Sequence, residues 1–195
     1  MAFIELVPEE RAGDAADLFE ADATLRGYLP NYTRAFAHRP DVYRAWRGLI
    51  GAIAGNMDTR RYELATFAAA RRLRSSYCAL AHGKVLADAF LSQAEVEALA
   101  RARTVESLDD VDRAVLDLAD AVAHDATAVT REDVDRLRAL GLSDAEILDV
   151  VLAAAVRCFY SKTLDALAVQ PDAAYSDLPP ALREALTVGR PVEGT

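Results

Sequence analysis

The chain has 195 residues, of which 52% are hydrophobic, and its formal net charge at pH 7 is −9. This length fits one ordinary domain or two small ones, and it is sufficient to bury a core without disulfide bonds. Lysine and arginine form no cluster with aromatic residues that could stack on bases, which argues against nucleic-acid binding because phosphate contacts require a positive surface.

The cysteine content and the start of the chain indicate a reducing compartment. Cys78 and Cys158 are the only cysteines, too few for the disulfide framework of a secreted protein. The first residues turn acidic early and lack the basic segment and apolar core of a signal peptide. No apolar run reaches the roughly 18 residues that a membrane helix needs. We therefore expect a cytoplasmic protein that does not bind a membrane.

The first part of the chain predicts short, irregular structure. Residues 1–40 contain Gly27, Pro30 and several aromatic residues at uneven spacing, which favours an arm of short helices. Such an arm is suited to wrapping a partner subunit. A longer helix is expected over residues 40–56, because Pro40 fits a first helical turn and apolar residues then recur with helical spacing.

Helix-capping residues divide the rest of the chain. Ser, Thr and Asp side chains accept hydrogen bonds from free amides at a helix start, and a Glu three residues later completes a capping box. Proline ends a helix because it lacks the amide that the next turn needs. These signals predict helices over residues 60–74 after Asp58 or Thr59, 77–91 after Ser75 or Ser76, 93–103 after Ser92 with Glu95, 111–124, 131–140 after Thr130, 145–169 after Ser143 with Glu146, and 179–188.

The same patterns define the fold class. No stretch alternates polar and apolar residues between hairpin turns, and no repeat of fixed period is present. We therefore predict an all-α fold in a single domain. Its parts are an N-terminal arm (residues 1–40), core helices (41–170) and a C-terminal segment (171–195).

Cys78 and His82 form the candidate reactive pair. If a helix begins at Ser75 or Ser76, Cys78 lies in its first turn and His82 lies four residues later on the same face. Free amides at a helix start stabilise a thiolate, and a nearby imidazole accepts its proton. The helix start alone contributes about 0.3 to 1 kcal/mol, so activation requires His82 or another partner.

Glu63, Cys78 and His82 resemble the core signature of the alkylhydroperoxidase AhpD/carboxymuconolactone decarboxylase superfamily. In that signature a Glu precedes a C-x-x-C motif by one helix, and a His follows the second cysteine by four residues. The resemblance covers about residues 40–170 and implies an AhpD-like helical fold. It also implies a thiol peroxidase in which Cys78 attacks a hydroperoxide while Glu63 and His82, with water, form a proton relay.

One position departs from the signature. Ser75 replaces the first, resolving cysteine, so the chain more closely resembles a peroxidase-related branch with S-x-x-C and requires an external thiol reductant. Tyr77, beside Cys78, either donates a hydrogen bond into the site or packs against it. No cofactor or metal is expected. Related proteins form trimers or hexamers, which implies a homo-oligomer that is a trimer, a hexamer or based on dimers.

Other functions remain open at this point. One is the decarboxylation of a lactone acid, which is the other chemistry of the superfamily. Another is a metal site with Glu63, Cys78 and His82 as ligands, although no C-x-x-C or H-x-x-x-H motif completes the usual set of four. The last is a non-catalytic oligomeric protein that retains a vestigial site.

The remaining cysteine and histidines are interpreted as structural. Cys158 lies in an apolar run and is expected in the core, with resolution of an oxidised Cys78 as the alternative. His38 and His124 have no cysteine or second histidine at ligand spacing, so we expect them at helix ends or on the surface.

Overall fold

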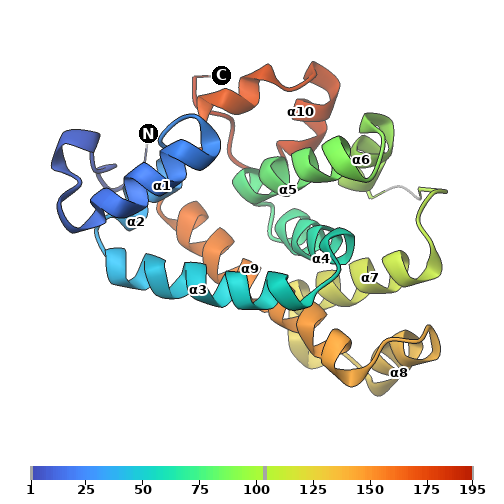
Figure 1. The fold of residues 1–195 in the computed structure, drawn as a ribbon. Helices are drawn as coiled ribbons and strands as arrows, with labels where there is room; N and C mark the ends of the chain where they lie inside the picture. Colours follow the sequence, from blue (N-terminus) through green and yellow to red (C-terminus); the bar gives the residue numbers. More distant parts are fainter. Residues whose placement is uncertain (1, 103–104, 195) are drawn as a thin grey trace.

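The computed structural model describes residues 2–102 and 105–194, which form helices and no strand, as predicted (Figure 1). Within these ranges no helix is long and apolar enough to cross a lipid bilayer. The α-helices are α1 (Ala16–Arg26), α2 (Asn31–Phe36), α3 (Pro40–Asn56), α4 (Thr59–Arg72), α5 (Ser76–Ala89), α6 (Gln93–Ala100), α7 (Asp110–Asp125), α8 (Arg131–Ala139), α9 (Asp144–Ala166) and α10 (Pro180–Leu186). Short 3-10 helices are η1 (Glu9–Arg11), η2 (Gly13–Ala15), η3 (Ala126–Ala128) and η4 (Ala173–Asp177).

Four of the predicted caps form, at Asp58, Ser92, Thr130 and Ser143, whereas the Ser75 side chain makes no cap hydrogen bond. The Ser92 amide donates to the Glu95 carboxylate at 2.7 Å, and the Glu95 amide donates back to the Ser92 hydroxyl at 3.3 Å. Ser143 and Glu146 form the same reciprocal pair at the start of α9. Asp58, rather than Thr59, caps α4. These local signals are reliable because each satisfies amides that the helix leaves free.

Helix α9 ends earlier than predicted. The expected helix continues to residue 169 before Pro171, whereas the observed one ends at Ala166. Ala168 adopts a left-handed conformation with φ of 54°, and the Val169 amide donates to the Leu164 carbonyl at 2.9 Å. This turn buries Ala168 and Val169, and their burial offsets the conformational cost of a non-glycine residue with positive φ.

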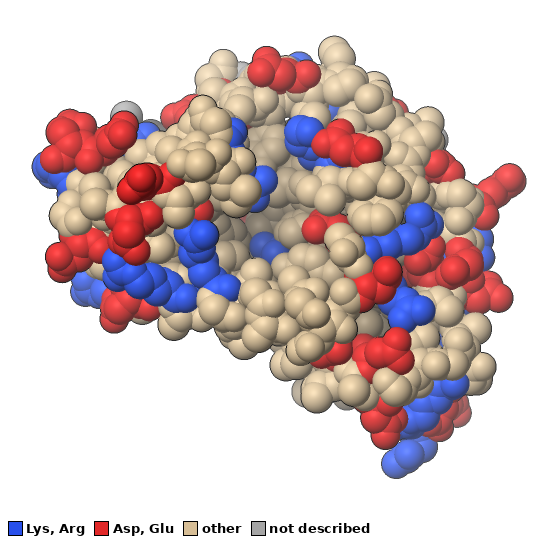
Figure 2. All heavy atoms as spheres, viewed as in Figure 1, with Lys and Arg blue, Asp and Glu red and all other residues tan. Residues whose placement is uncertain are grey.

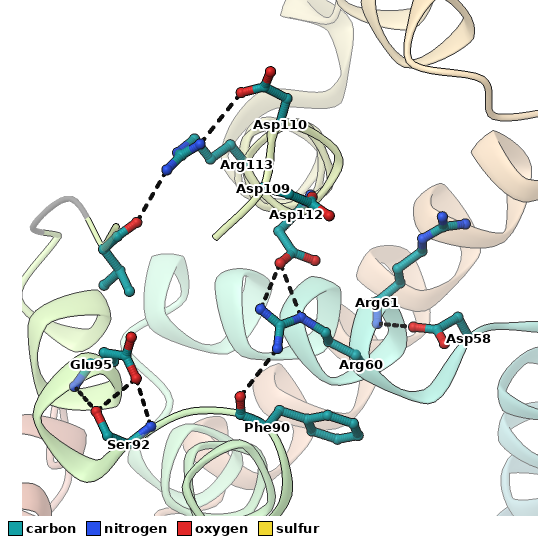
Figure 3. A network of polar contacts seen from close by, with 11 residues as sticks. Asp58, Arg60, Arg61, Phe90, Ser92, Glu95, Asp109, Asp110, Asp112 and Arg113 are labelled. Carbon is teal, nitrogen blue, oxygen red and sulfur yellow. Dashed lines mark hydrogen bonds and ion pairs between the residues drawn. The ribbon is translucent and has the colours of Figure 1, made fainter. Parts of the chain in front are cut away.

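Helix α4 occupies the centre of the fold. It packs against α5, α7 and α9, and every residue from Tyr62 to Ala70 is buried. Its alanines let the neighbouring helices approach closely. Arg60, at its start, donates to the Asp112 carboxylate of α7 and to the Phe90 carbonyl that follows α5 (Figure 3). This network holds α4, α5 and α7 together at one end.

The N-terminal segment packs against its own chain. The Phe3 amide donates to the Leu167 carbonyl at 2.8 Å, and the Asn31 amide donates to the buried Asp172 carboxylate at 2.7 Å. Tyr28 also donates to Asp172, at 3.1 Å. The segment is helical as expected, but it packs on the C-terminal end of α9 and on the C-terminal segment instead of projecting away as an arm. It thereby forms one wall of the cavity described next.

Candidate active site

A cavity of about 340 Å³ lies between the N-terminal helices, α3, α4, α5 and α9. Figure 2 shows a hollow in this face of the molecule, with basic side chains at its floor and rim. Cys78, His82 and Glu63 all line it, so the fold brings together the three residues of the sequence signature. The walls also contain six of the seven tyrosines and the only tryptophan: Tyr32, Tyr43, Tyr62, Tyr77, Tyr160, Tyr175 and Trp46.

His82 and Glu63 form a buried pair. Nδ1 of His82 and Oε2 of Glu63 are 2.6 Å apart, from α5 and α4 respectively. Burial, followed by the nearby positive charge of Arg157, lowers the pKa of His82 below 6.5, and Glu63 partly opposes this shift. The ring is therefore neutral at pH 7. With Nδ1–H donating to the carboxylate, Nε2 carries the lone pair and is available as a proton acceptor.

The Cys78 sulfur takes its hydrogen bonds from α9. Ser161 donates through its hydroxyl at 3.1 Å, and Arg157 donates through Nη1 at 3.7 Å. Cys78 lies in the first turn of α5, as expected. Among the described contacts, however, His82 is bonded to Glu63, and the direct partners of the sulfur are two residues outside the sequence signature. A guanidinium beside a thiol stabilises the thiolate.

Arg157 is a buried cation with an incomplete set of partners. Only 4% of the residue is exposed, and its Nε has no hydrogen-bond acceptor among the described residues. Burial opposes its charge, but the Cys78 sulfur and the Tyr62 hydroxyl raise its pKa overall. The guanidinium also lies 5.6 Å from the Tyr160 ring centroid. A buried positive charge without a carboxylate partner favours an anion in the cavity.

Ser75 and Tyr77 are both buried, and their contacts connect parts of the fold. Ser75 precedes α5 as its N-cap residue and is fully buried, although its side chain does not bond the helix amides. The Tyr77 hydroxyl accepts a hydrogen bond from the Tyr32 amide at 3.3 Å, which joins α5 to α2. Burial, and then the charge of Asp172, raise the Tyr77 pKa. Of the two alternatives for Tyr77, these contacts favour packing in the wall.

The other cysteine and histidines lie outside this constellation. Cys158 is half-buried next to the exposed Phe159, so the prediction that it belongs to the core is wrong. Its neighbour Arg157 takes the inward position because successive residues on a helix point in different directions. His38 and His124 are exposed, as predicted. Among the described residues, no three His, Cys, Asp or Glu side chains are placed to hold one metal ion.

A family model covers part of the chain. Residues 40–121 match the carboxymuconolactone decarboxylase family, and this range contains Glu63, Cys78 and His82. Arg157 and Ser161 lie beyond it. The comparison with curated protein sequences found no match.

Three solved structures have a similar fold. A peroxidase-related protein with an alkylhydroperoxidase AhpD core from Ralstonia eutropha JMP134 is 22% identical, with a TM-score of 0.76 over 90% of this chain and 93% of its own. A peroxidase-related protein from Silicibacter sp. TM1040 is 19% identical, with a TM-score of 0.74 over 90% and 91%. A variant of the debrominase Bmp8 in complex with 2,3,4-tribromopyrrole is also 19% identical, with a TM-score of 0.74 over 95% and 98%. At these identities the similarity establishes the fold alone.

Proposed function

We infer that this chain, whose residues 40–121 match the carboxymuconolactone decarboxylase family and whose fold is similar to that of an AhpD-core protein, is an enzyme that reduces hydroperoxides through Cys78. The observation that carries the proposal is the position of the thiol. Cys78 lines a cavity with a buried guanidinium on one helix and a neutral histidine–carboxylate pair on two others.

The first step is attack of the Cys78 thiolate on the terminal oxygen of the hydroperoxide. An S–O bond forms, the O–O bond breaks, and the sulfur becomes a sulfenic acid while the peroxide becomes an alcohol. Nε2 of His82, acting through water, takes the thiol proton and returns it to the leaving alkoxide. Glu63 holds the imidazole in the required tautomer. Arg157 stabilises the negative sulfur before attack.

The second step returns the sulfenic acid to the thiol. One molecule of an external thiol displaces water and forms a mixed disulfide with Cys78, and a second molecule releases the reduced enzyme. An external thiol is required because Ser75 stands at the resolving position. Cys158 is half-buried on the helix that carries Arg157, and both cysteines are free.

The decisive experiment measures sulfenic acid directly. We expect stoichiometric cumene hydroperoxide to add one oxygen atom to the protein, located at the Cys78 peptide and trapped by dimedone. Cys158→Ser is the matched control and retains the product, whereas Cys78→Ser loses it. A wild-type protein that consumes no peroxide and gains no oxygen would overturn the proposal.

A second candidate is thiol-dependent dehalogenation, favoured by the aromatic walls and by the similarity to the debrominase. In that reaction the Cys78 thiolate would take the halogen of an aryl bromide while a proton replaces it on the ring. External thiol would then release bromide and regenerate the enzyme. Bromide release from 2,3,4-tribromopyrrole tests this candidate. Release of carbon dioxide from a carboxylated lactone tests the decarboxylase alternative.

We also propose that the protein is a cytoplasmic homo-oligomer. Exposed apolar residues on α9 recur with the four-three-four spacing of a helix–helix seam, namely Leu148, Leu152, Ala155 and Phe159. Leu49 on the neighbouring α3 is 51% exposed. A second copy of this chain is the proposed occupant of this surface. Sedimentation of wild type and Leu152→Glu tests it, and a wild-type monomer would contradict it.

A further inference from the structure

The cavity walls contain a stack of parallel aromatic rings. The Trp46 and Tyr160 centroids are 4.2 Å apart with planes at 15°, and the Trp46 and Tyr43 centroids are 5.9 Å apart with planes at 12°. Flat walls of this kind select flat ligands, because a planar ring gains offset-stacked or edge contacts that a flexible chain does not. The indole Nε1 of Trp46 is buried without an acceptor among the described residues. Trp46 and Arg157 are thus two lining residues that each carry a buried donor without an acceptor among the described residues.

The two acidic residues of the lining already have partners within the protein. Asp22 is fully engaged: it accepts from Arg47 at 3.0 Å, from Tyr43 at 2.7 Å and from Thr33 at 2.6 Å. Glu63 is paired with His82, as described above. The lining carboxylates Asp22 and Glu63 are therefore both committed to protein partners.

Arg26 is the third arginine of the lining, with Arg47 and Arg157. It lies at the C-terminal end of α1, lines the cavity and is exposed, and it forms no salt bridge within the part of the chain that the structure describes. Its guanidinium is hydrogen-bonded to the Tyr32 hydroxyl, which is normally neutral and so does not balance the positive charge. An exposed arginine at the edge of an aromatic cavity provides a site for an anionic group that stays partly solvated.

We propose that the substrate is a flat aromatic hydroperoxide with one anionic substituent, whose ring packs against the Trp46 stack and whose anion meets Arg26. This inference rests on the proposed peroxidase function and names its substrate class. The size agrees: a cavity of about 150 Å³ holds benzene, and the 340 Å³ here accommodates a substituted ring. Cys78 is only 2% exposed, so the hydroperoxide group must enter ahead of the anion.

Binding of unreactive analogues tests the substrate class without turnover. We expect calorimetry to give about tenfold tighter binding for 4-isopropylbenzoate than for its neutral amide or for 4-isopropylcyclohexanecarboxylate, which is not flat. Trp46, the only tryptophan, reports occupancy through its fluorescence. Arg26→Gln should reduce the preference for benzoate over the amide to about twofold, whereas Arg131→Gln, an equal charge change on α8, should preserve it.

Turnover separates the substrate class from the peroxidase function. With an external thiol, kcat/KM should be about tenfold higher for the 4-carboxylate of cumene hydroperoxide than for cumene hydroperoxide, and lowest for tert-butyl hydroperoxide. Analogue binding with no hydroperoxide reduction would support the ligand class and refute the peroxidase. Equal reduction of all three hydroperoxides without benzoate binding would overturn the inference and leave the peroxidase standing. Equal binding of benzoate and amide, or an unchanged preference in Arg26→Gln, would also overturn it.

Discussion

The Sγ atom of Cys78 and the Nη1 atom of Arg157 lie 3.7 Å apart in the interior, although 79 positions separate them in the chain. A guanidinium stays charged at any pH at which the protein is folded. The environment of the thiol is therefore positive whether or not His82 carries a proton. The two proposed roles are therefore separate: Arg157 stabilises the thiolate, and the His82–Glu63 pair transfers protons.

Arg157→Met should slow alkylation of Cys78. Removing a charged hydrogen-bond donor from a buried acceptor costs about 1.5 to 3 kcal/mol, so the thiolate population, and with it the iodoacetamide rate at pH 7, should fall at least about tenfold. Mass spectrometry of the Cys78 peptide measures the rate, and the Cys158 peptide provides an internal control. Arg157→Lys keeps the charge, so its alkylation rate should lie between those of the wild type and Arg157→Met. An unchanged rate in a folded Arg157→Met protein would show that Arg157 does not activate the thiol.

Glu63→Gln should slow hydroperoxide reduction but leave the alkylation of Cys78 nearly unchanged. A carboxylate can only accept from Nδ1, whereas the amide can accept or donate, so the variant no longer fixes the tautomer that presents the Nε2 lone pair. General acid–base catalysis typically contributes about 10²- to 10⁴-fold. We expect kcat/KM for hydroperoxide to fall about 100-fold, while alkylation of Cys78 changes less than about threefold because Arg157 remains. Peroxide consumption and alkylation are measured on the same protein. Equal losses in both assays would contradict a separate proton-transfer role.

The stability of the protein should decrease on mild acidification. The folded-state pKa of His82 is lowered by burial and by Arg157, whereas the unfolded chain has the usual value of 6.5. Between pH 6.5 and the lower pKa of the folded state, the unfolded state therefore binds more protons than the folded state. The stability that the protein has above pH 6.5 is lost as the pH falls through this range. A tenfold difference in proton affinity between the folded and unfolded states corresponds to about 1.36 kcal/mol of stability.

Urea unfolding between pH 8 and pH 5.5, roughly the range in which histidine titrates, measures this loss. His82→Asn is the matched variant, because its amide nitrogen replaces Nδ1 opposite Glu63 but does not titrate. The wild type should lose more free energy of unfolding than the variant over this range. Parallel pH profiles for the two proteins would contradict the neutral, buried state of His82.

Local signals predicted the helices, and contacts distant in sequence completed the site. Ser92 and Ser143 cap their helices through residues three positions away, which a sequence pattern reveals. Arg157 and Ser161 meet Cys78 only through the packing of α9, so no spacing could place them there. The lone arginine in an otherwise apolar stretch of α9 was the available signal, since such a residue is rarely buried without a function. Ala168 gave no signal, because its left-handed turn depends on what the following residues bury.

Gly189→Ala should destabilise the protein. A Cβ at this position would clash with the Arg74 carbonyl oxygen, and the Gly189 amide donates to the Ser76 hydroxyl at 2.8 Å. A backbone carbonyl cannot rotate away as a flexible side chain can. The C-terminal segment must therefore move away from the start of α5, which costs about 1 to 3 kcal/mol of stability. Gly48→Ala, with open space on α3, should instead stabilise by about 0.5 to 1 kcal/mol. Urea unfolding compares them, and a neutral Gly189→Ala would show that the segment is not docked as described.

Ser75→Cys should restore two-cysteine chemistry. Position 75 is the N-cap of α5 and is fully buried, three residues before Cys78, so a sulfur there is placed inside the fold rather than in solvent. In wild type, excess peroxide should drive Cys78 from sulfenic to sulfinic acid unless an external thiol arrives first. In Ser75→Cys, a disulfide between positions 75 and 78 should form first and release water, which protects the sulfur from further oxidation.

Intact mass and peptide mapping after excess peroxide distinguish these products. The wild type should gain two oxygen atoms on the Cys78 peptide, whereas Ser75→Cys should lose two hydrogen atoms and show a far smaller sulfinic yield. Ser76→Cys is the matched control: its side chain starts two residues from Cys78 inside the helix and should not close a disulfide, because neighbours at that spacing point to different faces. If Ser75→Cys gives the wild-type sulfinic yield and no disulfide, Ser75 does not occupy the resolving position, and the one-cysteine character of the site has another cause.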